Sequence, residues 1–330
     1  MVRQKRAYLL LVIMVCLSLL LVGCGGNKSV QPSTTESQGN DTQGGGSQPV
    51  AQEEKPKINF PTQSITYSIP FDPGGQSDIE ARRQQPILEE ILGTSIVITY
   101  KPGGGGAVGW TELVNQKPDG YFIAGFNIPH IILQPLSDEN VGYKTEDINP
   151  IAIFQATPVG LAVHKDSGLE TLADFIEHAK QNPGAVTVAG SGTYSGHHIT
   201  HMLFEQKTGT KMQYIPFTGA AQSVQGFLGK NTMAIWANSS DLVAYKDEIN
   251  ILAIGSENTF YQFPDVPTFL EEGIDLITGI DRGVAAPPGT DPEIMAILED
   301  AFLQIANDPA IIQKMHEEGF EPKAMGAQES

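Results

Sequence analysis

Cysteine is almost absent from this chain of 330 residues, which contains only Cys16 and Cys24. The long remainder of the chain has no thiol, so disulfides, cysteine-based zinc sites and cysteine nucleophiles are excluded there. Basic residues are also scarce, because 20 Lys and Arg stand against 38 Asp and Glu, giving a net charge of −18. A phosphate-binding surface needs a basic face, so nucleic acid is not an expected partner.

The chain also lacks an apolar run of comfortable membrane-spanning length, which is about 20 residues. Its most apolar segment, residues 7–20, follows three basic residues and has the length typical of a secretory signal. It ends in Leu-Val-Gly-Cys at residues 21–24, which resembles a bacterial lipobox. We predict that residues 1–23 are a lipoprotein signal peptide and that Cys24 carries lipid, which anchors the protein on the extracytoplasmic face of the cell membrane. The alternative is an uncleaved anchor helix, which also places the body outside the cytoplasm.

From Cys24 to residue 59 the chain has almost no large apolar side chains and is rich in Gly, Ser, Gln, Thr and Pro. Such a segment cannot bury enough surface to offset the entropy of ordering, so we predict a disordered tether. The body that follows, residues 60–330, is long enough for two domains of ordinary size.

Strand-like and helix-like segments alternate through the body, which predicts an α/β fold. Strands are expected at 64–69, 96–100, 121–126, 151–155, 160–164, 185–189, 212–216, 232–237 and 249–254. Helices are expected at 77–92, 107–114, 174–181, 195–208, 221–228, 292–306 and 309–319. Ser77 and Asp78 are expected N-caps of the first helix. The repeated strand–helix units favour parallel sheets with both faces covered.

Glycine-rich turns open three of these helices, at residues 71–78, 101–108 and 190–198. Glycine lets the backbone approach a ligand closely, and free N–H groups at a helix start direct partial positive charge toward it. These turns therefore suit a carboxylate, sulfate or phosphate. The alternative for any single turn is a tight connection that needs glycine only for its backbone angles.

Two motifs suggest other chemistry and are set aside. Residues 190–196 fit a variant of the dinucleotide fingerprint, but no acidic residue ends the next strand to hold a ribose. His197 and His201 lie one helical turn apart, but the position of a metalloprotease glutamate is His198, and no third ligand stands out. No Gly-x-Ser-x-Gly elbow is present. We therefore expect neither an enzyme nor a cofactor, and no metal.

The ordered motifs of the body resemble the substrate-binding proteins of tripartite tricarboxylate transporters, the Bug/TctC family. The resemblance covers about residues 62–320 and rests on the order and spacing of segments 65–78, 101–106, 117–121, 172–184, 192–204, 215–219, 265–268, 271–273 and 286–290. It implies a two-lobed, type II periplasmic-binding-protein fold of the Venus-flytrap kind. Lobe 1 would hold residues 60–161 plus 280–330, and lobe 2 residues 162–279.

The resemblance also implies ligand-binding residues in both lobes. One carboxylate of the ligand would be held from the first lobe by Gly74, Gly75, Ser77 and Asp78. The second lobe would contribute Ser191, Gly192, Thr193 and Ser195, with His198, Thr218 and Gly219 nearby.

Three residues depart from the family pattern and are added to the expected site. Asp72 replaces a small or apolar residue, so it either points to solvent or recognises an ammonium group of an amino-acid-like ligand. Tyr194 replaces a glycine and would narrow the pocket or stack on the ligand. Arg282 stands where relatives carry an aromatic residue, and it is either a distal carboxylate clamp or one half of a surface or hinge ion pair with Asp281.

The function expected from these features is capture of a small di- or tricarboxylate, or a related organic acid, for membrane permease subunits of a tripartite tricarboxylate transporter. The receptor is expected to be a monomer. One alternative is a receptor that reports its ligand to a membrane sensor kinase. A third possibility, an exported hydrolase, needs a nucleophile such as Ser191 or Ser195.

Overall fold

The computed structural model describes residues 58–330, which lie within one compact unit, Pro56–Ser330. The expected signal peptide, Cys24 and nearly all of the tether lie outside the described residues. Within residues 58–330, no helix is both long and apolar enough to cross a bilayer.

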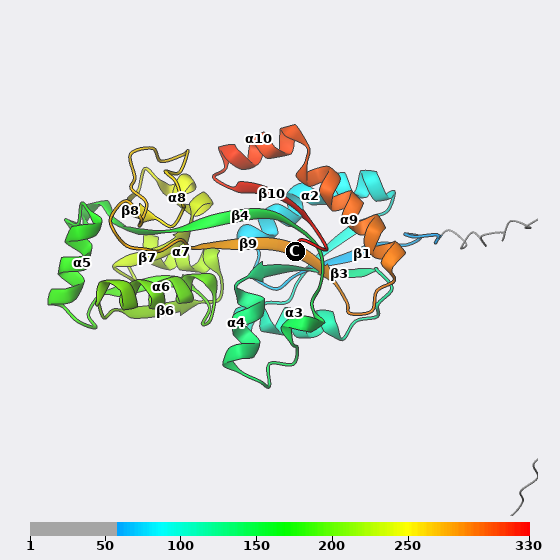
Figure 1. Cartoon of the computed structure of the whole chain (residues 1–330), viewed down its shortest axis with the longest axis horizontal. Helices are drawn as coiled ribbons and strands as arrows, with labels where there is room; N and C mark the ends of the chain where they lie inside the picture. The colour runs from blue at the N-terminus through cyan, green and yellow to red at the C-terminus, as the bar shows by residue number, and fades with distance from the viewer. Residues whose placement is uncertain (1–57) are drawn as a thin grey trace, which may run out of the picture. The chain divides into compact units, whose positions relative to one another are not determined.

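The first lobe is built from both ends of the described chain (Figure 1). Its early elements are β1 (Ile65–Ile69), α2 (Gln76–Leu92), β2 (Ile96–Tyr100), α3 (Ala107–Val114), β3 (Phe122–Ile128) and α4 (His130–Ser137). After the chain returns from the second lobe it adds β9 (Gly279–Ala286), α9 (Pro292–Ala306), α10 (Pro309–Glu317) and β10 (Glu321–Gly326). Helices α9 and α10 begin where the start signals place them, because Asp291 and Asp308 cap their N-termini and proline follows each.

The second lobe is one continuous stretch of chain between the two long strands β4 (Asn149–His164) and β9. It consists of α5 (Leu172–Gln181), β5 (Thr187–Ser191), α6 (Gly196–Thr208), β6 (Gln213–Phe217), α7 (Ala220–Leu228), β7 (Ala234–Asn238), α8 (Ser239–Tyr245) and β8 (Ile249–Ile254). Each lobe has its own apolar core. Tyr67 and Phe302 meet edge to face in the first, and Phe204, Trp236 and Phe269 cluster in the second.

Strand β4 belongs to both lobes, and it corrects the expectation of two separate strands at 151–155 and 160–164. Its first part pairs with β9 and β10, and its last six residues pair with β7 and β8. Figure 1 shows β4 and β9 running side by side between the lobes. Pro158 makes the sequence look interrupted, but it lies where the strand changes partners, so its missing N–H falls between the two ladders.

The expectation of purely parallel sheets is also wrong, because the sheet is mixed. Strand β1 pairs in parallel with β2 and β3, and β5 pairs in parallel with β6 and β7, whereas β4, β8, β9 and β10 add antiparallel pairings. The two parallel sets follow the rule that ligands bind beyond the carboxyl ends of such strands. Asn127 and Asn238, near the ends of β3 and β7, lie at this position.

Candidate functional site

A small cavity lies between the two lobes and is the centre of the candidate site. Its volume is about 30 Å³, the room of about one water molecule, so a larger ligand needs the lobes to separate first. Its lining comes from the β1–α2 loop, α2, β3, α4, β5, α6, the β6–α7 loop, α7, β7 and β9. The lining residues are Phe71, Asp72, Gly75, Gln76, Ser77, Asn127, His130, Ser191, His197, Gly219, Ala220, Gln222, Asn238, Ile280 and Arg282.

The β1–α2 loop presents an uncapped helix N-terminus to this cavity. Gly75 occupies the N-cap position of α2 and provides no side-chain hydrogen bond, so Ser77 and Asp78 are not the caps that the pattern suggests. Asp78 instead stabilises the loop, because its carboxylate accepts the Gly74 N–H at 2.8 Å and the Tyr100 hydroxyl at 2.7 Å. The N–H groups at the start of α2 therefore face a site that suits a negative charge.

Arg282 reaches the cavity from β9 and is only 4 % exposed. Its guanidinium donates hydrogen bonds to the Thr157 hydroxyl and to Asn238 Oδ1, and its Nε has no partner. None of the ion pairs within residues 58–330 involves Arg282. Burial lowers its pKa to about 10, although the Asp241 charge opposes this shift.

The neighbour of Arg282 on β9, Asp281, is not its ion-pair partner. Asp281 binds Lys323 of β10 at 2.7 Å, and successive side chains of a strand point to opposite faces. The surface or hinge ion pair considered for Arg282 is therefore wrong, and the guanidinium is a buried cation at the edge of the cavity.

His197 is held as a neutral imidazole. Its Nδ1 accepts the Ser191 backbone N–H at 3.1 Å, so its proton is on Nε2, which donates to Asn238 Oδ1 at 3.3 Å. Burial, with Arg282 as a smaller cause, lowers its pKa to about 4. The Ser191 hydroxyl lies 3.2 Å from the same Nδ1. A base of such low pKa, with its lone pair already in a hydrogen bond, is a poor activator of a serine nucleophile.

His130 is a second neutral imidazole and carries a free donor. Its Nε2 accepts the Gly196 N–H from the other lobe at 3.4 Å, which puts the ring proton on Nδ1. Nδ1 is buried and has no partner. Burial is the largest cause that lowers the His130 pKa well below its ordinary value, followed by the charge of Arg282.

The β5–α6 loop, residues 192–195, does not line the cavity, although the resemblance implies that it does. Ser195 caps α6, because its hydroxyl accepts the His198 N–H at 3.2 Å and donates to the Ser191 carbonyl at 2.8 Å. His198 packs against the ring of Tyr214, with centroids 4.6 Å apart. Neither Ser195 nor His198 lines the cavity.

Four other expected residues line a separate, larger hollow of about 450 Å³, together with the β2–α3 glycine turn: Gly192, Thr193, Tyr194 and Thr218. The lobes touch here, because the Gln134 side chain donates to the Thr193 carbonyl at 3.0 Å. Tyr194 has a left-handed backbone (φ 55°) and is 40 % exposed, with its ring edge-on to His198.

The structure thus brings six of the expected residues together around the cavity: Asp72, Gly75, Ser77, Ser191, Gly219 and Arg282. Gly74, in the β1–α2 loop, and Asp78, in the first turn of α2, lie outside the lining. Sequence reasoning missed six polar residues that line the cavity: Gln76, Asn127, His130, His197 (considered only as a metal ligand), Gln222 and Asn238. Two of them, Asn127 and Asn238, could have been found from the sequence, because each is an asparagine near the carboxyl end of a strand.

His197 and His201 do not converge on a common point. His201 Nδ1 accepts the Trp236 indole N–H at 3.2 Å, whereas His197 faces Ser191 and Asn238. Within residues 58–330, no group of three or more His, Cys, Asp and Glu side chains is placed to hold a metal ion.

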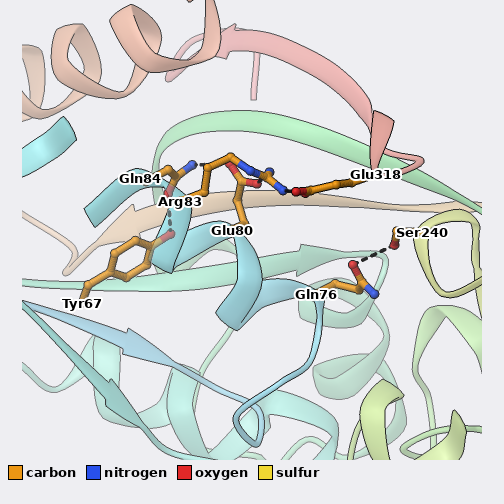
Figure 2. Close-up of polar contacts among 7 residues, drawn as sticks. All are labelled: Tyr67, Gln76, Glu80, Arg83, Gln84, Ser240 and Glu318. Carbon is orange, nitrogen blue, oxygen red and sulfur yellow. Dashed lines mark hydrogen bonds and ion pairs between the residues drawn. The ribbon is translucent and has the colours of Figure 1, made fainter. Parts of the chain in front are cut away.

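Gln76 joins the lobes beside the cavity (Figure 2). Its side-chain oxygen accepts the Ser240 hydroxyl at 2.7 Å, and its nitrogen donates to the Asp241 carboxylate at 2.6 Å. Asp241 also accepts the Asn238 side-chain N–H at 2.8 Å. The buried Asp241 carboxyl has a raised pKa, chiefly because of desolvation. Closure of the lobes is therefore tied to residues that border the ligand space.

Solved structures with the same fold are periplasmic binding proteins. A protein described as a periplasmic transporter is 28% identical, with a TM-score of 0.78 and coverage of 82% of this chain and 92% of its own. The R. palustris protein Rpa4515, solved with adipate, is 26% identical, with a TM-score of 0.78 and the same coverages. The fold and the interlobe cavity define a two-lobed solute-binding protein.

The family follows from the sequence comparisons. Residues 80–330 match the model of the tripartite tricarboxylate transporter family receptor, TctC. A Cupriavidus necator relative, the UPF0065 protein in gbd 5'region, is 30% identical over 272 residues, which cover 82% of this chain and 83% of that protein. The chain belongs to the tripartite tricarboxylate transporter receptor family, as its motifs predict.

Proposed function

We propose that this protein captures a small carboxylate between its lobes and delivers it to the membrane subunits of a tripartite tricarboxylate transporter. The observation that carries the proposal is Arg282, a buried cation at the cavity that pairs with no carboxylate in the described chain. A buried charge is costly unless it is paired and hydrogen-bonded. A ligand carboxylate would supply the missing partner.

The remaining polar groups support the same ligand class. Arg282 Nε and His130 Nδ1 are buried donors without acceptors, and the N-terminus of α2 adds backbone N–H groups of positive potential. A carboxylate accepts several hydrogen bonds and is bound more strongly by charged donors than by neutral ones. A relative solved with adipate shares the fold, which favours an organic acid or a related anion.

Closure would convert binding into a signal for the transporter. A ligand that contacts both lobes favours the closed state by its difference in affinity for the two states. Gln76 and Gln134 already connect the lobes through hydrogen bonds. The surface that the closed receptor presents to the permease would depend on these contacts.

Ligand screening tests the proposal directly. Protein freed of co-purified ligand by unfolding and refolding is heated with organic acids and acidic amino acids, and each acid is paired with its neutral amide. A carboxylate at 100 times its Kd should stabilise the fold by about 2.7 kcal/mol, which raises Tm by about 5 °C, and its amide should not. A panel in which no carboxylate raises Tm would refute carboxylate capture.

We also propose that Cys24 carries the lipid that keeps the receptor at the membrane. Because a diacylglyceryl thioether forms only on the cysteine thiol, Cys24→Ser should abolish incorporation of labelled fatty acid and move the protein from the membrane to the soluble fraction. Cys16→Ser is the matched control and should leave both unchanged. Membrane retention of Cys24→Ser with an unprocessed N-terminus would instead support an anchor helix.

A further inference from the structure

Resting on the carboxylate site proposed above, we infer that the cavity also contains an ammonium subsite, formed by Asp72 of the first lobe and Gln222 of the second. The preferred ligand is then an amino acid, and the organic acid of the same shape without the nitrogen binds more weakly.

The lining contains four titratable side chains: Asp72, His130, His197 and Arg282. Both imidazoles are neutral, because burial lowers each pKa and each ring accepts a backbone N–H. The charged side chains that remain in the lining are Arg282 and Asp72. An organic dianion would leave this space with excess negative charge, whereas an ammonium group on the ligand offsets the charge of Asp72.

The unpartnered groups divide into donors and acceptors. The donors Arg282 Nε and His130 Nδ1 are buried without acceptors, which suits a carboxylate. On the acceptor side, Gln222 Oε1 is buried without a donor, and none of the ion pairs within residues 58–330 involves Asp72. Asp72 and Gln222 both line the cavity, and an alkylammonium, which has three donors and no acceptor, is the ligand group that such a pair of acceptors would bind.

The position of the two acceptors links the subsite to closure. Asp72 is in the β1–α2 loop and Gln222 is in the first turn of α7, so the ammonium would be held from both lobes. Asp241 lies behind this part of the lining, where its carboxyl accepts hydrogen bonds from Gln76 and Asn238, both of which line the cavity. The lining has no second Lys or Arg to favour an additional carboxylate at this end.

The test compares matched ligand pairs by titration calorimetry on the full chain at pH 7: aspartate with succinate, glutamate with glutarate, and alanine with propionate. In at least one pair the amino acid should bind ten-fold or more tightly than its partner. Asp72→Asn keeps the shape of the side chain and removes its charge, so it should reduce that preference at least ten-fold and leave the affinity for the organic acid equal or higher. Asp275→Asn, at a side chain that is 94 % exposed, is the control and should change neither affinity.

Three outcomes would overturn the ammonium subsite. If the organic acid binds as tightly as the amino acid in every pair, or if Asp72→Asn leaves the preference intact, the subsite is refuted while carboxylate capture stands. If no compound of either kind binds, the proposed function fails with it. Loss of all binding in Asp72→Asn, with a normal Tm, also contradicts the subsite, because the organic acid does not need Asp72.

Discussion

Two buried arginines in this protein have opposite surroundings, and they should respond oppositely to the same substitution. Arg83 on α2 is paired with Glu80 and Glu318 (Figure 2). Its guanidinium also lies 5.0 Å from the centroid of the Phe320 ring. Arg282 has no carboxylate partner. We therefore expect Arg83→Gln to destabilise the ligand-free protein, and Arg282→Gln to stabilise it while weakening ligand binding.

The expected change in stability for each variant follows from the surroundings of the arginine that it replaces. Lowering the pKa of Arg282 from 12.5 to about 10 corresponds to roughly 3 kcal/mol against the charged form. Glutamine removes this charge but forms fewer hydrogen bonds, at a cost of about 1–2 kcal/mol. The net gain for the ligand-free protein is then about 1–2 kcal/mol, a rise in Tm of about 2–4 °C. Removing one partner of a buried pair costs about 3–5 kcal/mol, so Arg83→Gln should lower stability by that amount.

For the ligand, Arg282→Gln removes the charged partner of its carboxylate. Loss of a buried charged hydrogen-bond partner costs about 2–5 kcal/mol, so Kd should rise by at least about 30-fold. Arg83 lies outside the cavity lining, so Arg83→Gln should leave Kd within a few-fold of wild type at a temperature where the variant is folded.

The assay is urea unfolding of ligand-free protein together with calorimetric titration of the best ligand, for wild type and both variants. The reasoning about Arg282 is refuted if Arg282→Gln unfolds at a lower urea concentration than wild type and binds the ligand with unchanged Kd. That result would mean that Arg282 is a structural residue whose charge is satisfied within the protein.

Two further predictions concern α2. The pKa of Glu80 is raised to about 7, chiefly by burial, against 4.5 in the unfolded chain. The folded protein therefore holds a proton on Glu80 more tightly than the unfolded chain does. This contribution to stability is complete below pH 4.5 and is lost as pH rises through 7, so ligand-free stability should fall between pH 5 and 8 by up to about 3 kcal/mol. Glu80→Gln should flatten this fall in urea unfolding, and an unchanged slope would contradict the assignment. Gln76→Ala removes the bonds to Ser240 and Asp241 that join the lobes, so ligand dissociation in stopped-flow experiments should accelerate about 5- to 30-fold. Gln313→Ala, an exposed glutamine on α10, is the control; equal dissociation rates in both variants would show that the Gln76 bonds do not hold the closed state.

Local signals predicted many elements of the fold well. Helix α9 and strands β2 and β8 have the bounds that the sequence pattern suggests, because an Asp-Pro start or a short β-branched run marks each of them. The antiparallel strands β9 and β10 were not predicted, and β4 was divided in two. The partners of β9 and β10 are more than a hundred residues away in the chain, so no local period reveals these pairings.

The residues of the candidate site likewise divide into those that local motifs predict and those that depend on distant parts of the chain. Gly75 was accessible from sequence because its glycine turn is a local motif, whereas Gly219 was expected only from the family resemblance. The unpartnered state of Arg282 was not, because it depends on Asp281 turning to Lys323 and on Thr157 and Asn238 arriving from other strands. His130 was missed because its neutral, donor-bearing state depends on Gly196 of the opposite lobe.

Strand β4, which pairs within both lobes, makes the protein different from two domains joined by a linker. Each lobe's sheet is completed by the same β4 chain, so melting one lobe removes hydrogen-bond partners from the edge of the other. The body should consequently lose its structure as a single cooperative unit, and a ligand bound between the lobes protects both at once. Occupancy would then govern the lifetime of the whole receptor, since an empty protein exposed to proteases opens more often than a loaded one.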